Sequence, residues 1–253
     1  MHITERQSDI LNFLIEEYIY KAEPISSGFI EEISDLGVSA ATIRNDLQEL
    51  TKKKFIIQLH TSGGRVPTDR GYRFYVDNLI NSEDLDINYS WQKRVDAVLA
   101  SISSEPRDIN KTIAQLVSDL SESVVITGIA EDDDFYKTGL ASLFEMPEFR
   151  EINKVFRMTS FFDEFDRIFD QIEKEFFGAS KAVGDPEDLN IFIGHENRHP
   201  SIKDETVMTI RYTLPNNLVG SLTIIGPTRM DYRKNIGLIR YTTDKINQLT
   251  KNI

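Results

Sequence analysis

Residues 39–50 carry polar side chains that can hydrogen-bond the edges of DNA bases. Ile43, Leu47 and Leu50 recur at i, i+4 and i+7, which predicts a helix with one buried stripe. At about 100° per residue, the side chains that flank or oppose this stripe are small or rich in hydrogen-bonding groups: Ala41, Thr42, Arg44, Asn45 and Gln48. Arg, Asn and Gln can make paired hydrogen bonds with guanine or adenine in the major groove. We therefore predict a recognition helix in which Thr42, Arg44, Asn45 and Gln48 read DNA. An ordinary surface helix, usually rich in Glu and Lys pairs, is the alternative.

A Gly-rich turn with one arginine follows this helix. Residues 55–60 are predicted to form a strand, and residues 61–65 a tight turn in which glycine supplies a positive φ. A strand, a turn and a returning strand make the wing of a winged helix. We predict that Ser39 and the wing hold phosphates or enter the minor groove, through the side chains of His60, Thr61, Ser62 and Arg65 and the backbone amides of Gly63 and Gly64. An ion pair between Arg65 and Asp69 is the alternative role for this arginine.

Further helices are expected to position these residues. Thr4 and Gln7 are spaced as a capping box at the start of a first helix that runs to residue 20. Pro24 ends that helix, and Ser26 or Ser27 can cap a short second one. A turn at residues 36–38 and the recognition helix follow, and residues 71–80 resume helical spacing. This order predicts a winged helix-turn-helix.

The remainder of the chain is predicted to form an α+β domain. Short β-rich runs predict strands at residues 124–129, 189–194, 206–214 and 218–226. Helices are expected at residues 91–102, 108–120, 138–144, 148–158, 164–177 and 231–249. We predict three parts: a winged-helix DNA-binding domain at residues 1–80, a linker and connecting helix at residues 81–105, and a domain with a mostly antiparallel sheet at residues 106–253.

Charge is unevenly distributed along the chain. The 253 residues have a formal net charge of −12, whereas residues 39–73 contain seven basic and three acidic side chains. From residue 78 onward there are 20 Lys and Arg against 29 Asp and Glu. Because phosphate attraction supplies most non-specific affinity for DNA, we expect the basic segment to contact DNA. Residues 1–77 as a whole, however, contain nine basic and twelve acidic side chains, so non-specific affinity should be weak and binding should depend on specific contacts and on dimerisation.

The sequence offers little for catalysis or metal binding. It contains no cysteine, no P-loop and no Gly-x-Ser-x-Gly motif, so we predict that the protein is not an enzyme and has no cofactor. His195 and His199 have the i, i+4 spacing of a helical metal site, but the preceding apolar strand and Pro200 favour a turn, and we predict no metal. No apolar run is long enough to span a membrane and no leader is found, so we expect a cytoplasmic protein with no membrane partner.

Five strings of residues resemble the heat-inducible transcription repressor family, HrcA. They are S-A-A-T-I-R-N-D-L-Q-E-L (39–50), H-T-S-G-G-R-V-P-T-D-R-G-Y-R-F-Y-V-D (60–77), P-E-F (147–149), I-G-H-E-N (193–197) and I-G-P-T-R-M-D-Y (225–232). The resemblance implies a homodimeric repressor with an N-terminal winged helix and a GAF-like core. It implies double-stranded DNA as the partner, as an inverted-repeat operator upstream of chaperone genes. It also implies a chaperonin of the GroE type, which keeps the repressor active until heat stress occupies the chaperonin with unfolded proteins.

The chain is shorter than usual members of that family. The missing part falls between residues 120 and 134, where the family has further core strands and an inserted dimerising subdomain. We therefore expect a reduced GAF-like domain that lacks the usual inserted subdomain. We expect dimerisation through the Phe-rich helix at residues 161–177 and the C-terminal helix, with Ile236, Ile239 and Ile246. A metabolite-sensing winged-helix regulator that uses the GAF-like domain is the alternative function.

Overall fold

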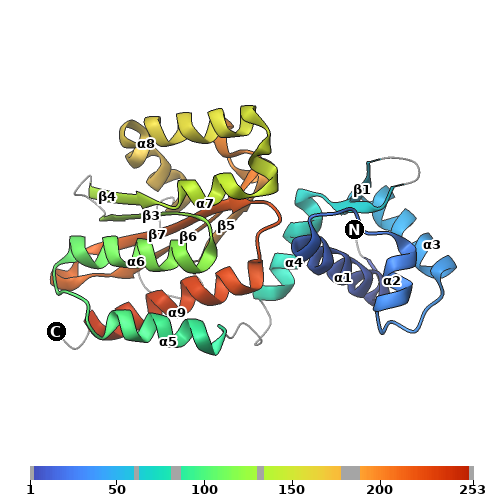
Figure 1. Ribbon diagram of the computed structural model, residues 1–253, viewed down its shortest axis with the longest axis horizontal. Coiled ribbons are helices and arrows are strands. Elements are labelled where there is room, and N and C mark those ends of the chain that lie inside the picture. Colours follow the sequence, from blue (N-terminus) through green and yellow to red (C-terminus); the bar gives the residue numbers. More distant parts are fainter. Residues whose placement is uncertain (1–2, 60–62, 81–86, 130–133, 178–188, 251–253) are drawn as a thin grey trace. The chain divides into compact units, whose positions relative to one another are not determined.

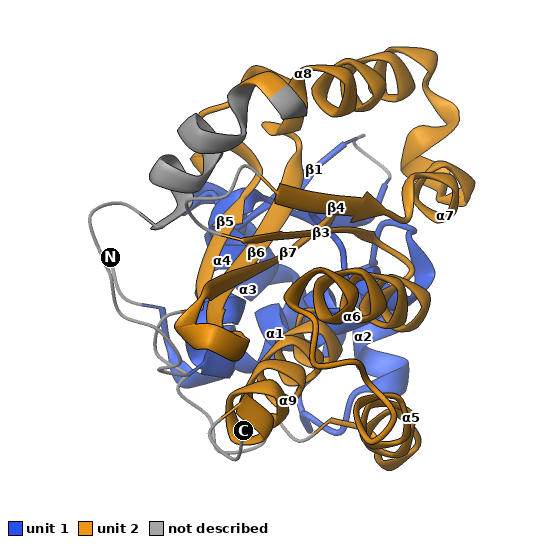
Figure 2. Ribbon diagram, turned by 90° about the vertical axis from the view of Figure 1, so that its left-hand side faces the viewer, with its two compact units in different colours: residues 1–84, 228–231 blue, residues 85–227, 232–253 orange. Residues whose placement is uncertain are grey.

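The chain divides into two compact units (Figure 2). The structure, a computed structural model, describes residues 3–59, 63–80, 87–129, 134–177 and 189–250, without the side chains of residues 166 and 168–177. Unit 1 comprises Met1–Asp84 and Thr228–Asp231, and unit 2 comprises Leu85–Pro227 and Tyr232–Ile253. The predicted linker falls partly on residues 81–86, outside the described residues, and the helix after it, α5 (Tyr89–Leu99), belongs to unit 2.

Unit 1 is a winged helix-turn-helix, as predicted (Figure 1). Its elements are α1 (Glu5–Lys21), α2 (Ser27–Ile33), α3 (Ala40–Lys52), β1 (Ile56–Gln58), β2 (Arg65–Pro67) and α4 (Asp69–Ile80). The capping box of Thr4 and Gln7 is confirmed at the start of α1, and the Ser26 side chain caps α2. Strand β1 pairs with β2 antiparallel and is shorter than the strand predicted at residues 55–60.

The core of unit 1 contains the apolar stripe predicted for α3. Ile43, Leu47 and Leu50 are fully buried together with Ile10 and Leu14 of α1, against which α3 packs. The turn between α2 and α3 places Gly37 at a φ of 65°, a left-handed conformation that glycine adopts without a steric penalty. The predicted helix, Gly turn and second helix are thus present in the expected order.

Unit 1 also contains four residues from late in the chain. Thr228–Asp231 follows the last strand of the sheet in unit 2 and precedes the last helix. The Nη1 atom of Arg229 donates a hydrogen bond of 3.1 Å to the carbonyl oxygen of Ile19 in α1. Unit 1 is therefore assembled from two separate stretches of sequence.

A five-stranded antiparallel sheet forms the centre of unit 2. Its strand order is β4-β3-β7-β6-β5. The strands are β3 (Val124–Ile129), β4 (Asp134–Thr138), β5 (Asn190–Ile193), β6 (Glu205–Thr213) and β7 (Val219–Pro227). The predicted α+β class and four of these strands are confirmed. The edge strand β4 was not predicted, and the helix expected at residues 138–144 begins after it as α7 (Leu140–Glu145).

Helices cover both faces of this sheet (Figure 1). On one face α6 (Pro106–Ser121) contacts β3, α9 (Tyr232–Thr250) contacts β6, and α5 packs on both helices. On the other face α8 (Ile152–Phe177) contributes Met158, Phe161, Phe162 and Phe165 to an apolar cluster with residues of β3, β6 and β7. The described connections also contain short 3-10 helices, at η1 (Pro147–Arg150), η3 (Gly194–Glu196), η4 (Pro200–Ile202) and η5 (Pro215–Asn217).

Two expectations for unit 2 are wrong. The helices predicted at residues 148–158 and 164–177 are one helix, α8. Phe161, which lies in the predicted gap between them, packs on the sheet from within this continuous helix. The side chains expected at a dimer surface on the C-terminal helix, Ile236, Ile239 and Ile246, are buried in the core of the unit itself, and so are Phe161 and Phe165. These five side chains are covered within one chain, whereas the side chains of residues 168–177, the rest of the expected Phe-rich surface, lie outside the described residues, and for them the expectation stays a prediction.

The His-rich string at residues 195–199 forms turns, as predicted. His195 lies in η3, and His199 accepts a hydrogen bond at Nδ1 from the Ser201 amide, 3.3 Å away. The His199 ring lies edge-on to Phe161 at 5.3 Å between centroids. Within the residues that the structure describes, no group of three or more His, Asp or Glu side chains is arranged to hold a metal ion.

Candidate nucleic-acid interface

Helix α3 exposes the face predicted to read DNA. Ala41, Arg44, Asn45 and Gln48 are exposed, and Thr42 is half-buried. In the described part of the chain, no hydrogen bond or ion pair occupies the side chains of Arg44, Asn45 or Gln48. Two successive turns of one helix therefore present a guanidinium and two carboxamides whose donors and acceptors can meet a ligand.

The N-terminus of α3 is capped within the protein. The Ser39 hydroxyl accepts a hydrogen bond of 3.4 Å from the Thr42 amide and lies 3.1 Å from the Thr42 hydroxyl. The Ala40 amide donates to Oε1 of Glu31 over 2.7 Å. Ser39 is exposed, as a phosphate contact requires, but its hydroxyl already has a structural role. A phosphate at the Ala40 amide would have to displace the Glu31 carboxylate.

A buried carboxylate fixes α3 against α1. Asp46 lies on the buried side of α3 and is only 5 % exposed. Its carboxylate accepts hydrogen bonds from Nε of Arg6 at 2.7 Å and from Nε2 of the buried Gln7 at 3.1 Å. Asp46 was not singled out from the sequence, although its position beside Leu47 placed it near the buried stripe. This contact sets the rotation of α3 about its own axis and thereby the direction of the exposed polar face.

The wing is held close to the backbone that joins α1 and α2. Arg65 and Ile25 exchange two backbone hydrogen bonds of 2.8 and 3.0 Å. A Cβ atom on Gly64 would lie 2.6 Å from both the carbonyl carbon and the oxygen of Pro24. The expectation of a positive φ is wrong at Gly64, where glycine is required by this close approach instead. His60, Thr61 and Ser62 lie outside the described residues, and the Gln58 side chain donates to the Gly63 carbonyl oxygen.

Arg65 projects from the wing as a half-buried cation. Partial burial lowers the pKa of Arg65 from its usual value, and the nearby charge of Arg44 lowers that pKa further. Its Nε atom is buried without a hydrogen-bond partner. Over the described ranges Arg65 forms no ion pair, so the alternative pairing with Asp69 is not supported. The recognition helix and the wing thus place two guanidinium groups within electrostatic range of each other, which favours an anion between or beside them.

Two family models match the chain. One described as HrcA protein C terminal domain matches residues 78–236, and one described as DeoR-like helix-turn-helix domain matches residues 15–67. The second match includes α2, α3 and both strands of the wing. No helix among the described residues is both long enough and apolar enough to cross a membrane.

Curated proteins named heat-inducible transcription repressor HrcA are similar over nearly the whole chain. The protein from Ruminiclostridium cellulolyticum is 26% identical, with 98% of this chain and 97% of the relative covered. The protein from Acetivibrio thermocellus is 27% identical, with 98% and 96% covered. The first alignment runs over 346 residues, so that relative contains stretches without a counterpart in this 253-residue chain.

One solved structure has the same fold. It is described as a hypothetical protein at 2.2 Å resolution and is 17% identical to this chain, with a TM-score of 0.77 over 99% of both chains. A likeness at this identity concerns the fold alone, and it extends over both units.

Proposed function

Because the chain belongs to the HrcA family, we propose that it is a sequence-specific DNA-binding repressor of heat-shock (chaperone) genes. Its relatives are named heat-inducible transcription repressors, and a helix-turn-helix model matches the segment that contains α3. The proposal assigns the chain no catalytic activity. As a repressor, the protein would act in the cytoplasm, where the chromosome lies.

The exposed polar face of α3 carries the proposal. Arg44, Asn45 and Gln48 are exposed on a helix whose opposite face is fixed by buried apolar contacts and by Asp46. In a helix-turn-helix the second helix enters the major groove, where these side-chain types distinguish bases. Arg65, on the wing, has the charge and the partial exposure for a backbone phosphate or a narrow minor groove. We assign base reading to the face of α3 and positioning to Ser39 and the wing.

The repressor is further proposed to bind an inverted repeat as a homodimer. Residues 1–77 contain nine basic and twelve acidic side chains, so a single unit 1 should bind DNA weakly. Linking two such units raises the effective concentration of the second one at its half-site by orders of magnitude. The family resemblance also supports a chaperonin of the GroE type as the partner that keeps the repressor active and is withdrawn by heat stress.

DNA recovered with the full chain from cells and sequenced would define the operator. Binding to that duplex and to a random duplex is then measured for the parent, Arg44→Ala, Asn45→Ala and Arg65→Ala. We expect Arg44→Ala and Asn45→Ala each to lose about 1–3 kcal/mol on the operator and much less on random DNA. Arg65→Ala should weaken both complexes and reduce the slope of log K against log salt by about one.

Arg94→Ala is the matched control, because it removes the same charge from an exposed position on α5 in unit 2. Equal losses on operator and random DNA for Asn45→Ala would contradict base reading by α3. A salt slope that is unchanged in Arg65→Ala would contradict a phosphate contact from the wing. Failure to recover any preferred DNA sequence would contradict the repressor function itself.

A further inference from the structure

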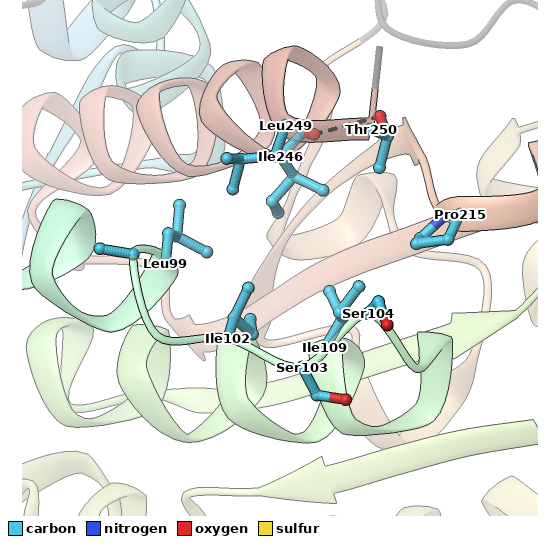
Figure 3. Close-up of a pocket in the computed structure, with 10 residues that line it drawn as sticks. Leu99, Ile102, Ser103, Ser104, Ile109, Pro215, Ile246, Leu249 and Thr250 are labelled. Carbon is cyan, nitrogen blue, oxygen red and sulfur yellow. Dashed lines mark hydrogen bonds between the residues drawn. The ribbon is translucent and has the colours of Figure 1, made fainter. Parts of the chain in front are cut away.

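A pocket lies within unit 2, between the C-terminal ends of α5 and α9 (Figure 3). Its volume is about 220 Å³, and its walls come from the α5–α6 connection, α6, the β6–β7 turn and α9. The side chains of Leu99, Ile102 and Ile109 converge with Ile246 and Pro215 on one shared space. This space is separate from the DNA-reading face, which belongs to unit 1.

Among the residues that the structure describes, the lining of the pocket contains no charged side chain. Its polar groups are three hydroxyls, from Ser103, Ser104 and Thr250. The Thr250 hydroxyl donates to the Ile246 carbonyl oxygen at 3.1 Å, which leaves its oxygen able to accept a bond. The Ser103 oxygen accepts from the Glu105 amide at 3.0 Å, which leaves its O–H able to donate. An apolar pocket with a few hydroxyls fits a molecule that has a hydrocarbon body and one uncharged polar group.

The volume of the pocket limits the size of the molecules that can bind in it. A cavity of about 150 Å³ lined by aliphatic and aromatic side chains takes up benzene. A volume of about 220 Å³ therefore has room for one ring with a short substituent, or for a branched chain of similar bulk. A nucleotide is larger and carries charge that this lining cannot compensate.

We propose that unit 2 contains a binding site for a small, neutral, ring-sized amphipathic molecule, with its hydrocarbon body against Leu99, Ile109 and Ile246 and its polar group at the hydroxyls. This site goes beyond the proposed repression and does not depend on it. The elements around it are anchored to each other, because Asp96 of α5 accepts a hydrogen bond of 2.9 Å from the Tyr241 hydroxyl of α9 and pairs with Lys245. These contacts hold α5 against α9 beside the pocket.

The test uses two aromatic probes with equal numbers of heavy atoms, 4-ethylphenol, which is neutral at pH 7, and the anion benzoate. Each is titrated into the full chain, and the methyl NMR signals of Leu99, Ile109 and Ile246 are followed. We expect saturable shifts of these signals with 4-ethylphenol at a Kd on the order of 1 mM or below, as for a ligand of about nine heavy atoms. The anion should bind at least about tenfold more weakly, because none of the described lining residues carries a positive charge.

Two variants that fill the pocket localise the binding. Leu249→Trp places a larger side chain at a wall residue that is 38% exposed, and Ala100→Leu adds bulk at an exposed lining position. Either variant should weaken the binding of 4-ethylphenol about tenfold or more, because the larger side chain fills volume that the ligand needs. Ile33→Trp, a similar enlargement at a position of α2 that is 53% exposed, should leave the affinity unchanged.

Three outcomes would overturn the proposal. One is the absence of saturable binding to the folded parent up to about 10 mM, beyond the range of a specific small ligand. Another is binding that neither filling variant weakens, because the ligand would then sit elsewhere. The third is exclusion of both probes together with a change in molecular mass in Leu249→Trp, which would identify the pocket as an interface between copies of the chain.

Discussion

Replacement of Gly64 by alanine should disturb the wing, because the new methyl group has no space. The added Cβ would lie 2.6 Å from two backbone atoms of Pro24 and 2.7 Å from the carbonyl carbon of Ile25. These are main-chain atoms and cannot rotate away as the end of a side chain could. The Cβ would have to move from 2.6 Å to an ordinary contact distance, and the wing can make that shift only if the two hydrogen bonds between Arg65 and Ile25, of 2.8 and 3.0 Å, lengthen or break.

The size of the effect follows from two opposing contributions. Overpacking against rigid neighbours costs about 1–3 kcal/mol. Alanine also lowers the conformational entropy of the unfolded chain, which stabilises the folded state by about 0.4–1 kcal/mol. We therefore expect the free energy of unfolding of unit 1 to fall by about 1–2 kcal/mol, which corresponds to a decrease in Tm of about 5–15 °C for a domain of this size. Gly28→Ala is the matched control: its Cβ would meet nothing within 4 Å, and in helix α2 it should raise stability by up to about 1 kcal/mol.

The assay combines thermal unfolding with hydrogen exchange at the amides of Ile25 and Arg65 in the full chain. In Gly64→Ala we expect both amides to exchange faster, and in Gly28→Ala we expect the rates of the parent or slower ones. Operator affinity should fall in the first variant, because Arg65 is then held by a displaced strand. If Gly64→Ala keeps the exchange rates and the stability of the parent, the close approach does not constrain the wing and the reasoning is refuted.

Two further predictions concern buried carboxyl groups. Asp46→Ala should lower the free energy of unfolding by about 2 kcal/mol in urea titrations, because the Gln7 amide, in a residue only 6% exposed, loses its acceptor. Asp46→Asn retains an acceptor oxygen, so its free energy of unfolding should fall less than that of Asp46→Ala. An equal decrease in the two variants would show that the acceptor for Gln7 is not what stabilises the fold. Burial raises the pKa of Glu205 to about 8, above the ordinary 4.5, so the folded protein retains a proton that the unfolded chain releases. The stability due to this proton is complete below pH 4.5 and is lost as the pH rises to about 8, so Glu205→Gln should be more stable than the parent at pH 9 and similar to it at pH 4.5. A difference in stability between Glu205→Gln and the parent that stays constant from pH 4.5 to pH 9 would show that Glu205 does not titrate in this way.

The recognition helix could be predicted from the sequence because its signals are local. The spacing of Ile43, Leu47 and Leu50 defines the buried face, and the Ser39 hydroxyl caps the first turn. The exposure of Arg44 and Asn45 then follows from helix geometry. Their role in reading DNA remains a prediction.

Features that depend on contacts between distant residues could not be predicted. Strand β4 is an edge strand with half-buried residues throughout, and it pairs with β3 without an apolar pattern of its own. Residues 159–163 suggested a break, yet Phe161 and Phe162 keep α8 continuous through their packing on the sheet. The need for glycine at Gly64 comes from a strand-to-loop approach across about forty residues of sequence, which no local preference encodes.

The split origin of unit 1 imposes an order on its completion during synthesis. Residues 1–84 leave the ribosome first, whereas Thr228–Asp231 follows only after all five strands of the described sheet have been made. Until then, the carbonyl oxygen of Ile19 lacks the bond from Arg229. A nascent chain therefore carries the recognition helix long before its DNA-binding unit is whole, and the unit becomes whole at the same stage of translation as the sheet of unit 2.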